Sequence, residues 1–282
     1  MRFGKLAWTD IEPFGAEVDC DLRESLTVAE QQRLRELLFE RQILVFRDQH
    51  LSETRQIEIM RYIGPVRAIH DFVHKVSNDK TKGSLGTQEL TYHSDLAFAE
   101  EPRLALSLHA LDIVDGGSST RYVSGVHAAG RLPAALKERL RGLTALHTYP
   151  GYDFTAGAAE LPRWVPRHSH PVLMPHPVTG RPVLYVTQMQ TALIDGLPTE
   201  ESSALIQALK SQIYTDDNLY EHVWRDGDLV IWDNIATQHA RGDVSASGPR
   251  TLQKVQISDR TFAEQWPLYS SDEMQAALRG YL

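Results

Sequence analysis

The run Leu229-Val230-Ile231-Trp232 is followed by Asp233-Asn234 and then by Thr237-Gln238-His239. Four consecutive large apolar residues, preceded by the turn residues Gly227 and Asp228, are typical of a strand buried on both faces. The polar residues that follow end this strand and bring a histidine close to the core. We therefore expect the chain to fold around residues 229–232, with His239 reaching inward from a neighbouring element.

Local signals also predict the elements around this strand. Thr27 and Glu30 form a capping box, so a helix is expected from there to about Gln42. The apolar run Ile43–Phe46 is expected to form a second buried strand. The other expected elements are a helix from Ser52 to Gly64, a long loop over Leu146–Trp164, a hairpin around residues 176–181, a helix from Thr199 to about Gln212 and a strand over Leu252–Ile257.

Short strands are spread along the chain, and the helices lie mainly near its start. This order favours a single α+β domain over residues 1–282, with a β-sandwich or jelly-roll core and flanking helices. A doubly wound nucleotide-binding sheet is disfavoured, because no glycine-rich loop joins a strand to a helix.

Composition excludes several classes of protein. The 282 residues include 29 basic and 37 acidic ones, which gives a net charge of −8, and no basic block argues for nucleic-acid binding. No apolar run approaches the roughly 20 residues that a membrane helix needs, and no secretory signal is seen. A single cysteine, Cys20, excludes an internal disulfide framework. We expect a cytoplasmic protein that acts on a small molecule and binds neither nucleic acid nor a membrane.

The sequence His93-Ser94-Asp95 could supply two metal ligands, because residues i and i+2 of a strand point to the same face. Chance alone would place one such pair in a chain of this composition about as often as not. Together with His239, however, the pair would give two imidazoles and one carboxylate on one face of an octahedral metal. That is the facial triad of non-haem Fe(II) oxygenases, which leaves positions open for a co-substrate and O₂.

Arg250 follows His239 by 11 residues and lies on the expected last strand. A guanidinium there could hold the distal carboxylate of a 2-oxo acid that chelates the metal. A surface salt bridge is the ordinary role of a single arginine. The co-substrate role is favoured only because the three candidate metal ligands are also present.

These segments resemble the family of taurine and 2-oxoglutarate-dependent dioxygenases, which includes phenoxyacetate and alkyl-sulfate dioxygenases. The resemblance covers almost the whole chain. It is carried, in order, by Ile43–Gln49, His93-Ser94-Asp95 with Phe98 and Pro102, Gly116-Gly117, His170-Pro171-Val172, His176–Arg181, Leu184-Tyr185-Val186, Gly227–Asn234 and Thr237-Gln238-His239.

The resemblance implies a double-stranded β-helix, the jelly-roll form, and a homo-oligomer that is a dimer or larger. It also implies Fe(II) bound by His93, Asp95 and His239, with 2-oxoglutarate held by Arg250 and Ser119. O₂ would then be consumed, with succinate and CO₂ released and a small organic substrate hydroxylated or otherwise oxidised. The carboxylate of Asp95 favours hydroxylation over halogenation, because related halogenases have a small residue at that position.

Three residues are candidates for substrate binding. His70 matches a substrate-contacting histidine of the sulfonate-using members, and Lys254 matches a second arginine that grips the substrate anion. Glu89 stands where those members have an asparagine, so we expect it to repel a sulfonate and to exclude taurine. The alternative is that Glu89 and Lys254 form a surface ion pair without a role in selectivity.

Two other interpretations stay open at this point. The chain could be a non-catalytic jelly-roll protein that binds or senses a metal or 2-oxoglutarate. A second metal site could involve His168, His170 and His176, although their spacing is loose and no carboxylate accompanies them. The sequence does not identify the substrate.

Overall fold

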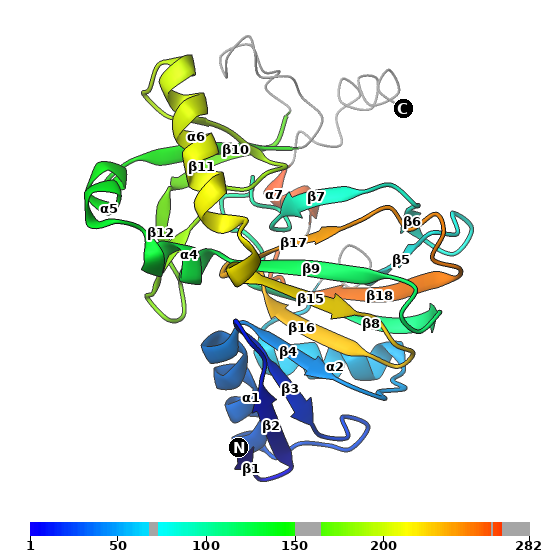
Figure 1. Ribbon diagram of the computed structural model, residues 1–282. Helices are drawn as coiled ribbons and strands as arrows, with labels where there is room; N and C mark the ends of the chain where they lie inside the picture. The colour runs from blue at the N-terminus through cyan, green and yellow to red at the C-terminus, as the bar shows by residue number, and fades with distance from the viewer. Residues whose placement is uncertain (68–72, 150–164, 261, 267–282) are drawn as a thin grey trace.

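The apolar run Leu229–Trp232 forms most of β16 (Leu229–Asp233), which lies in the middle of the largest sheet (Figure 1). The computed structural model describes residues 1–67, 73–149, 165–260 and 262–266. The strand is buried along its whole length, as four apolar residues in succession predict. Leu229 and Ile231 face one side of the sheet and Val230 and Trp232 face the other, so each side packs against its own core.

The largest sheet has nine strands in the order β1-β2-β3-β4-β16-β8-β18-β5-β6. Besides β16 these are β1 (Arg2–Phe3), β2 (Leu6–Asp10), β3 (Ala16–Asp19), β4 (Ile43–Phe46), β8 (Ala105–Ile113), β18 (Arg250–Gln256), β5 (Val73–Ser77) and β6 (Ser84–Leu85). Neighbouring strands of this sheet are antiparallel, except for the parallel pairs β3–β4 and β5–β6.

A second sheet of four strands has the order β15-β9-β17-β7 and lies against the first (Figure 1). Its strands are β15 (Leu219–Val223), β9 (Ser119–Ser124), β17 (Thr237–Arg241) and β7 (Leu90–His93). Tyr122 of β9 packs with Trp232 and Leu252 of the large sheet in one buried cluster. The space between the two sheets therefore holds a continuous core, and the candidate metal ligands lie at its edge.

Two helices cover the outer face of the large sheet, α1 (Val28–Arg41) and α2 (Glu53–Ile63). Both begin where the sequence predicts, because Thr27 closes a capping box with Glu30 and the Ser52 hydroxyl accepts from the Arg55 N–H. The predicted end of the second helix at Gly64 is also found.

Most of the remaining elements form a lobe beside the two main sheets (Figure 1). The predicted hairpin is present as β12 with β13, and the predicted helix from Thr199 is α6. The elements of this lobe are α4 (Gly125–Arg131), α5 (Ala134–Leu140), β10 (Thr144–Thr148), β11 (Arg167–Pro171), β12 (Leu173–Pro175), β13 (Pro182–Leu184), β14 (Thr191–Ile194), α6 (Thr199–Ile213) and the 3-10 helix η2 (Asp216–Asn218). The last helix, α7 (Phe262–Gln265), follows β18 and lies outside this lobe (Figure 1).

Two sequence predictions need correction here. Residues 146–148 belong to β10 and not to a loop, because they pair with β11 and β14 across long stretches of chain. The last strand begins at Arg250, two residues earlier than predicted. The coarse prediction of a mixed fold of helices and sheets is confirmed. Each helix in the described part of the chain is too short or too polar to cross a bilayer.

Candidate active site

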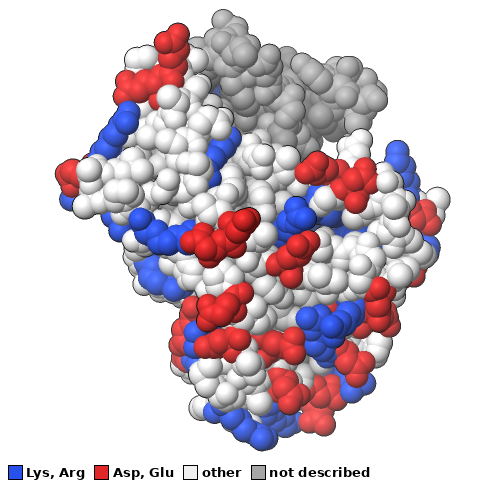
Figure 2. Space-filling model, viewed as in Figure 1, with Lys and Arg blue, Asp and Glu red and all other residues white. Residues whose placement is uncertain are grey.

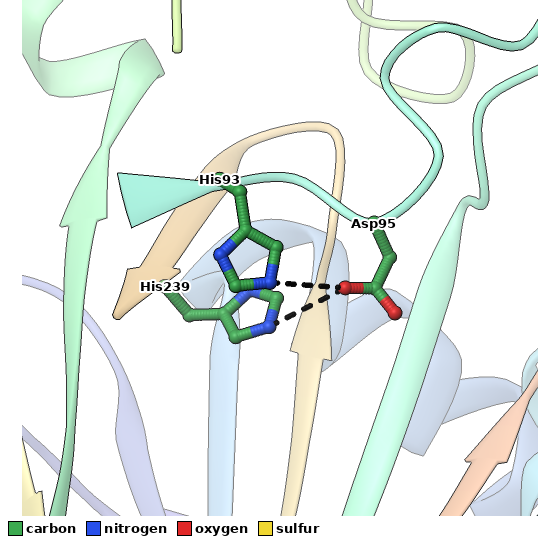
Figure 3. Close-up of side chains that lie close together, drawn as sticks. All are labelled: His93, Asp95 and His239. Carbon is green, nitrogen blue, oxygen red and sulfur yellow. Dashed lines mark ion pairs between the residues drawn. The ribbon is translucent and has the colours of Figure 1, made fainter. Parts of the chain in front are cut away.

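His93 and His239 come together because their strands are neighbours. His93 is the last residue of β7 and His239 is the middle residue of β17, and the two are direct cross-strand partners. Residues opposite each other on antiparallel strands project to the same side of the sheet. Their imidazole ring centres are consequently only 4.1 Å apart (Figure 3).

Asp95 reaches the two histidines from a turn that follows β7, and not from the strand itself as the spacing suggested. Asn234 fixes this turn, because its Oδ1 accepts from the Asp95 N–H at 2.8 Å and its Nδ2 donates to the Asp95 carbonyl at 3.0 Å. Asp95 Oδ1 lies 3.4 Å from His93 Nε2 and 3.5 Å from His239 Nε2 (Figure 3). Of the described residues, these three alone form a group able to hold a metal, with all ligand atoms within 4.8 Å of one another.

The surroundings of the histidines prepare them as ligands. His93 Nδ1 lies 2.8 Å from the Thr91 carbonyl, to which it donates, so that Nε2 keeps its lone pair for a metal. Burial and the nearby His93 ring lower the pKa of His239 well below its usual value. A neutral imidazole is the form that binds a metal ion.

Lys254 makes a short ion pair with Asp95 Oδ2, and both side chains are nearly buried. Burial alone would raise the pKa of the Asp95 carboxyl. The Lys254 ammonium and the two imidazoles lower it by more than burial raises it, so the pKa lies well below its usual range. Lys254 thus faces the candidate metal site, as predicted, but its partner is a ligand residue of this site.

Arg250 lines the same cavity as the triad and Lys254. The residue is only 2% exposed. Its Nε donates to the Ser118 hydroxyl at 3.2 Å, while its Nη1 has no hydrogen-bond partner in the described part of the chain. Burial and the neighbouring Arg241 lower the pKa of Arg250 to about 9, which leaves it charged at neutral pH. A buried cation with an unused donor is suited to bind a carboxylate.

The prediction for Ser119 is wrong by one position along β9. The Ser119 hydroxyl donates to Glu221 Oε1 at 2.5 Å on the exposed side of the strand. Because side chains alternate along a strand, the next residue, Thr120, faces inward and lines the cavity with Arg250. Thr120 is therefore the hydroxyl residue placed to meet a carboxylate there.

Of the two remaining substrate candidates, only Glu89 belongs to the described residues, and it does not join this site. Glu89 is exposed and does not line the cavity, whereas its neighbour Leu90 does, so the physical basis for excluding taurine is lost. The alternative of a Glu89–Lys254 ion pair is also wrong, since Lys254 pairs with Asp95. His70 lies outside the described residues.

Sequence reasoning missed several residues that the fold brings to the site. His74 of β5 is the cross-strand partner of Lys254, and Arg241 of β17 lines the cavity two residues after His239. Strand alternation from His239 would have found Arg241, and alternation from a correct register would have found Thr120. Nothing local in the sequence indicates Asn234, because its amide acts on a turn 139 residues away.

Comparisons with known proteins agree with this geometry. The family model described as "Taurine catabolism dioxygenase TauD, TfdA family" matches residues 7–256. An alpha-ketoglutarate-dependent 2,4-dichlorophenoxyacetate dioxygenase from Cupriavidus pinatubonensis is 27% identical over 267 residues, which cover 86% of this chain and 93% of that protein. An alpha-ketoglutarate-dependent sulfate ester dioxygenase from Pseudomonas putida is 25% identical, over 88% of this chain and 89% of that protein.

Solved structures show the same fold. A taurine dioxygenase from Burkholderia xenovorans superposes with a TM-score of 0.76 at 24% identity, over 90% of this chain and 91% of that one. The structure of AAD-2 in complex with Mn(II) and N-oxalylglycine gives a TM-score of 0.77 at 22% identity, over 91% and 98% of the two chains.

Fold, triad and relatives together define an enzyme, a dioxygenase that depends on Fe(II), 2-oxoglutarate and O₂. The chain belongs to the taurine catabolism dioxygenase family TauD/TfdA. The family, enzyme class and cofactors predicted from the sequence are thereby confirmed, and the non-catalytic alternative is set aside.

Proposed function

We propose that His93, Asp95 and His239 bind the catalytic Fe(II), and that Arg250 and Thr120 hold the distal carboxylate of 2-oxoglutarate. When bound, Fe(II) would supply the site at which O₂ is activated, coupling decarboxylation of 2-oxoglutarate to succinate with oxidation of a small organic substrate. The observation that carries this proposal is one cavity that contains both the three-ligand group and a buried arginine with an unused donor.

The protein's own side chains orient and shield the reactants. The Thr91 carbonyl fixes the His93 ring, and the Asn234 amide fixes the turn that presents Asp95. Trp232 and Leu108 line the cavity between the two sheets, so water is excluded from one side of it. This arrangement supports a double-stranded β-helix as the finer description of the fold, in a single domain over residues 1–282.

An anionic substrate is the class that the charges favour. Three cationic side chains, Arg241, Arg250 and Lys254, line the cavity with one carboxylate, Asp95. A bound divalent metal would add further positive charge, more than 2-oxoglutarate alone neutralises. The names of two relatives, a phenoxyacetate dioxygenase and a sulfate ester dioxygenase, also specify anionic substrates. We propose a small organic carboxylate or sulfate ester, with Lys254 released from Asp95 to contact the anionic group.

Other partners stay predictions of the sequence. On the face shown in Figure 2, acidic and basic side chains of the described residues are interspersed, which gives no support to a nucleic-acid surface. Homo-oligomer formation and a cytoplasmic location stay part of this proposal.

The test of this function is turnover by the Fe(II)-loaded protein. With 2-oxoglutarate, ascorbate and a panel of phenoxyacetates, alkyl sulfates and taurine, succinate release should exceed the substrate-free rate for at least one anion. His93→Ala, Asp95→Ala and His239→Ala should each abolish it and should each weaken Mn(II) binding, because each removes one of three protein ligands. Full activity in any of these variants would remove that residue from the metal site.

A further inference from the structure

Arg241 is a second buried arginine at the proposed co-substrate site. It is the last residue of β17, two positions after His239, so the two side chains project to the same side of the sheet. Arg241 is only 4% exposed and lines the cavity together with Arg250 and Thr120.

The guanidinium of Arg241 is only partly satisfied by the protein. Its Nη2 donates to the carbonyls of Leu85, at 3.3 Å, and Gln88. Its Nε and Nη1 are buried and have no hydrogen-bond partner in the described part of the chain, and no carboxylate there forms an ion pair with it. Burying a charge in this way is costly unless an anion compensates it.

Arg250 has the same deficit, and the two arginines influence each other. The nearby Arg241 adds to burial in lowering the pKa of Arg250, as expected for like charges that share a low-dielectric space. Two neighbouring guanidinium groups with unused donors favour the binding of one anion that has several acceptor oxygens.

The strand register indicates which bound anion Arg241 can contact. Ala240 pairs with Arg121, so Arg241 lies level with Thr120, about 7 Å along the strand from His239. Arg250 lies at the same end of the cavity, because its Nε donates to the hydroxyl of Ser118, two residues before Thr120. Lys254 lies at the other end, beside Asp95. A 2-oxo acid bound to a metal at the triad would extend its distal carboxylate toward Arg241, whereas a substrate beside Lys254 would lie at the other end.

We propose that Arg241 is a second arginine for the distal carboxylate of 2-oxoglutarate, so that two guanidinium groups and the Thr120 hydroxyl hold it together. This inference rests on the proposed function. It gives the enzyme a stricter requirement for a 2-oxo acid with a distal carboxylate than a single arginine would.

The experiment compares two ligands that differ only in this carboxylate. Binding of 2-oxoglutarate and of 2-oxopentanoate, which has a methyl group in its place, is measured by calorimetry on the Mn(II)-loaded protein without O₂. Arg241→Gln should weaken the binding of 2-oxoglutarate by about 10- to 100-fold and change the affinity for 2-oxopentanoate by no more than about twofold. Arg241→Lys should recover part of the lost affinity, because lysine keeps the positive charge but lacks the planar guanidinium that donates two parallel hydrogen bonds.

Controls separate the possible failures. Arg121→Gln removes an exposed arginine from the outer side of β9 and should change neither ligand. Equal weakening of both ligands in Arg241→Gln would show a merely structural role, and an unchanged affinity for 2-oxoglutarate would remove Arg241 from the site. If Arg241→Gln does not fold, Arg241→Lys carries the same comparison. Failure of the wild-type Mn(II) protein to bind 2-oxoglutarate would instead overturn the proposed function.

Discussion

Asp95 shows how many separate constraints one metal ligand needs. Its backbone is held by the Asn234 amide, one carboxylate oxygen faces two imidazoles, and the other pairs with Lys254. None of these partners lies close to Asp95 in sequence except His93. The spacing of His93 and Asp95 correctly indicates that they share a site, but it gives the wrong local structure, because a turn and not strand alternation aims the carboxylate.

The first prediction at the residue scale concerns Asn234, which is fully buried. Its Nδ2 donates to the carbonyls of both Asp95 and Arg103. Asn234→Ala should lower Mn(II) affinity by about 10- to 100-fold, because the ligand loses its orienting partner. It should also cost about 1–3 kcal/mol of unfolding free energy, because buried groups are left unpaired. Metal titration and urea unfolding measure the two effects, and unchanged metal affinity in a folded variant would contradict the prediction.

A second prediction concerns Lys254, whose ammonium pairs with the Asp95 oxygen that does not face the imidazoles. Lys254→Met removes the counter-ion of a buried carboxylate, so the metal-free protein should unfold at a lower temperature. The rise in unfolding temperature on adding Mn(II) should be larger than in the wild type, because no ammonium charge then repels the metal ion. Thermal unfolding with EDTA or with Mn(II) provides the comparison, and an equal or smaller rise would show that Lys254 does not oppose metal binding.

At the scale of elements, strand alternation explains both the successes and the errors of sequence reasoning. Arg250 and Lys254 share a face of β18 and line one cavity, as predicted. The same rule places Ser119 outside and Thr120 inside, but it can be applied only when the register of β9 is known. That register is set by pairing with β17, more than 100 residues later, and no local pattern records it.

A third prediction concerns the turn between β16 and β17, from which His239 is presented. Asp233 accepts from the Ile235 and Ala236 N–H groups, and His176 Nε2 lies 2.9 Å from its other oxygen. His176 Nδ1 accepts from two backbone N–H groups, so its Nε2 carries the proton and donates to Asp233. Both side chains are buried, so removing His176 leaves the Asp233 carboxylate without one of its donors. His176→Ala should therefore cost about 2–3 kcal/mol of unfolding free energy in urea unfolding experiments.

The matched control for this variant is an exposed ion pair. Glu201 pairs with Arg139 at 3.0 Å with both side chains about half exposed. Glu201→Ala should cost less than about 1 kcal/mol. Similar losses in the two variants would mean that the buried pair contributes no more than a surface pair.

For the molecule as a whole, local signals predicted the elements that depend on neighbours in sequence. The capping box of α1 and the apolar run of β16 are examples. The pairing of the two main sheets, the placement of β10 and the role of Arg241 depend on contacts between distant segments. The family resemblance supplied the metal and co-substrate assignments as expectations, and the register of β9 is the reason that we propose Thr120 in place of Ser119.

The last prediction follows from histidines buried inside the fold, of which His147 is the clearest. His147 is fully buried, and burial, reinforced by the nearby His170 and His168, lowers its pKa to about 3. Between pH 3 and the ordinary value of about 6.5, the unfolded chain binds a proton at His147 that the folded protein does not. Stability from this residue is therefore complete above pH 6.5 and is lost as the pH falls, at about 1 kcal/mol per pH unit near pH 5.5. Urea unfolding between pH 7 and pH 5 in EDTA should show a slope of at least this size, because other buried histidines with a lowered pKa add to it. The slope of His147→Gln should be shallower by about 1 kcal/mol per pH unit. The comparison of slopes isolates His147 from the other histidines, because they are present in both proteins. Parallel slopes in the two proteins would mean that His147 takes up its proton without unfolding.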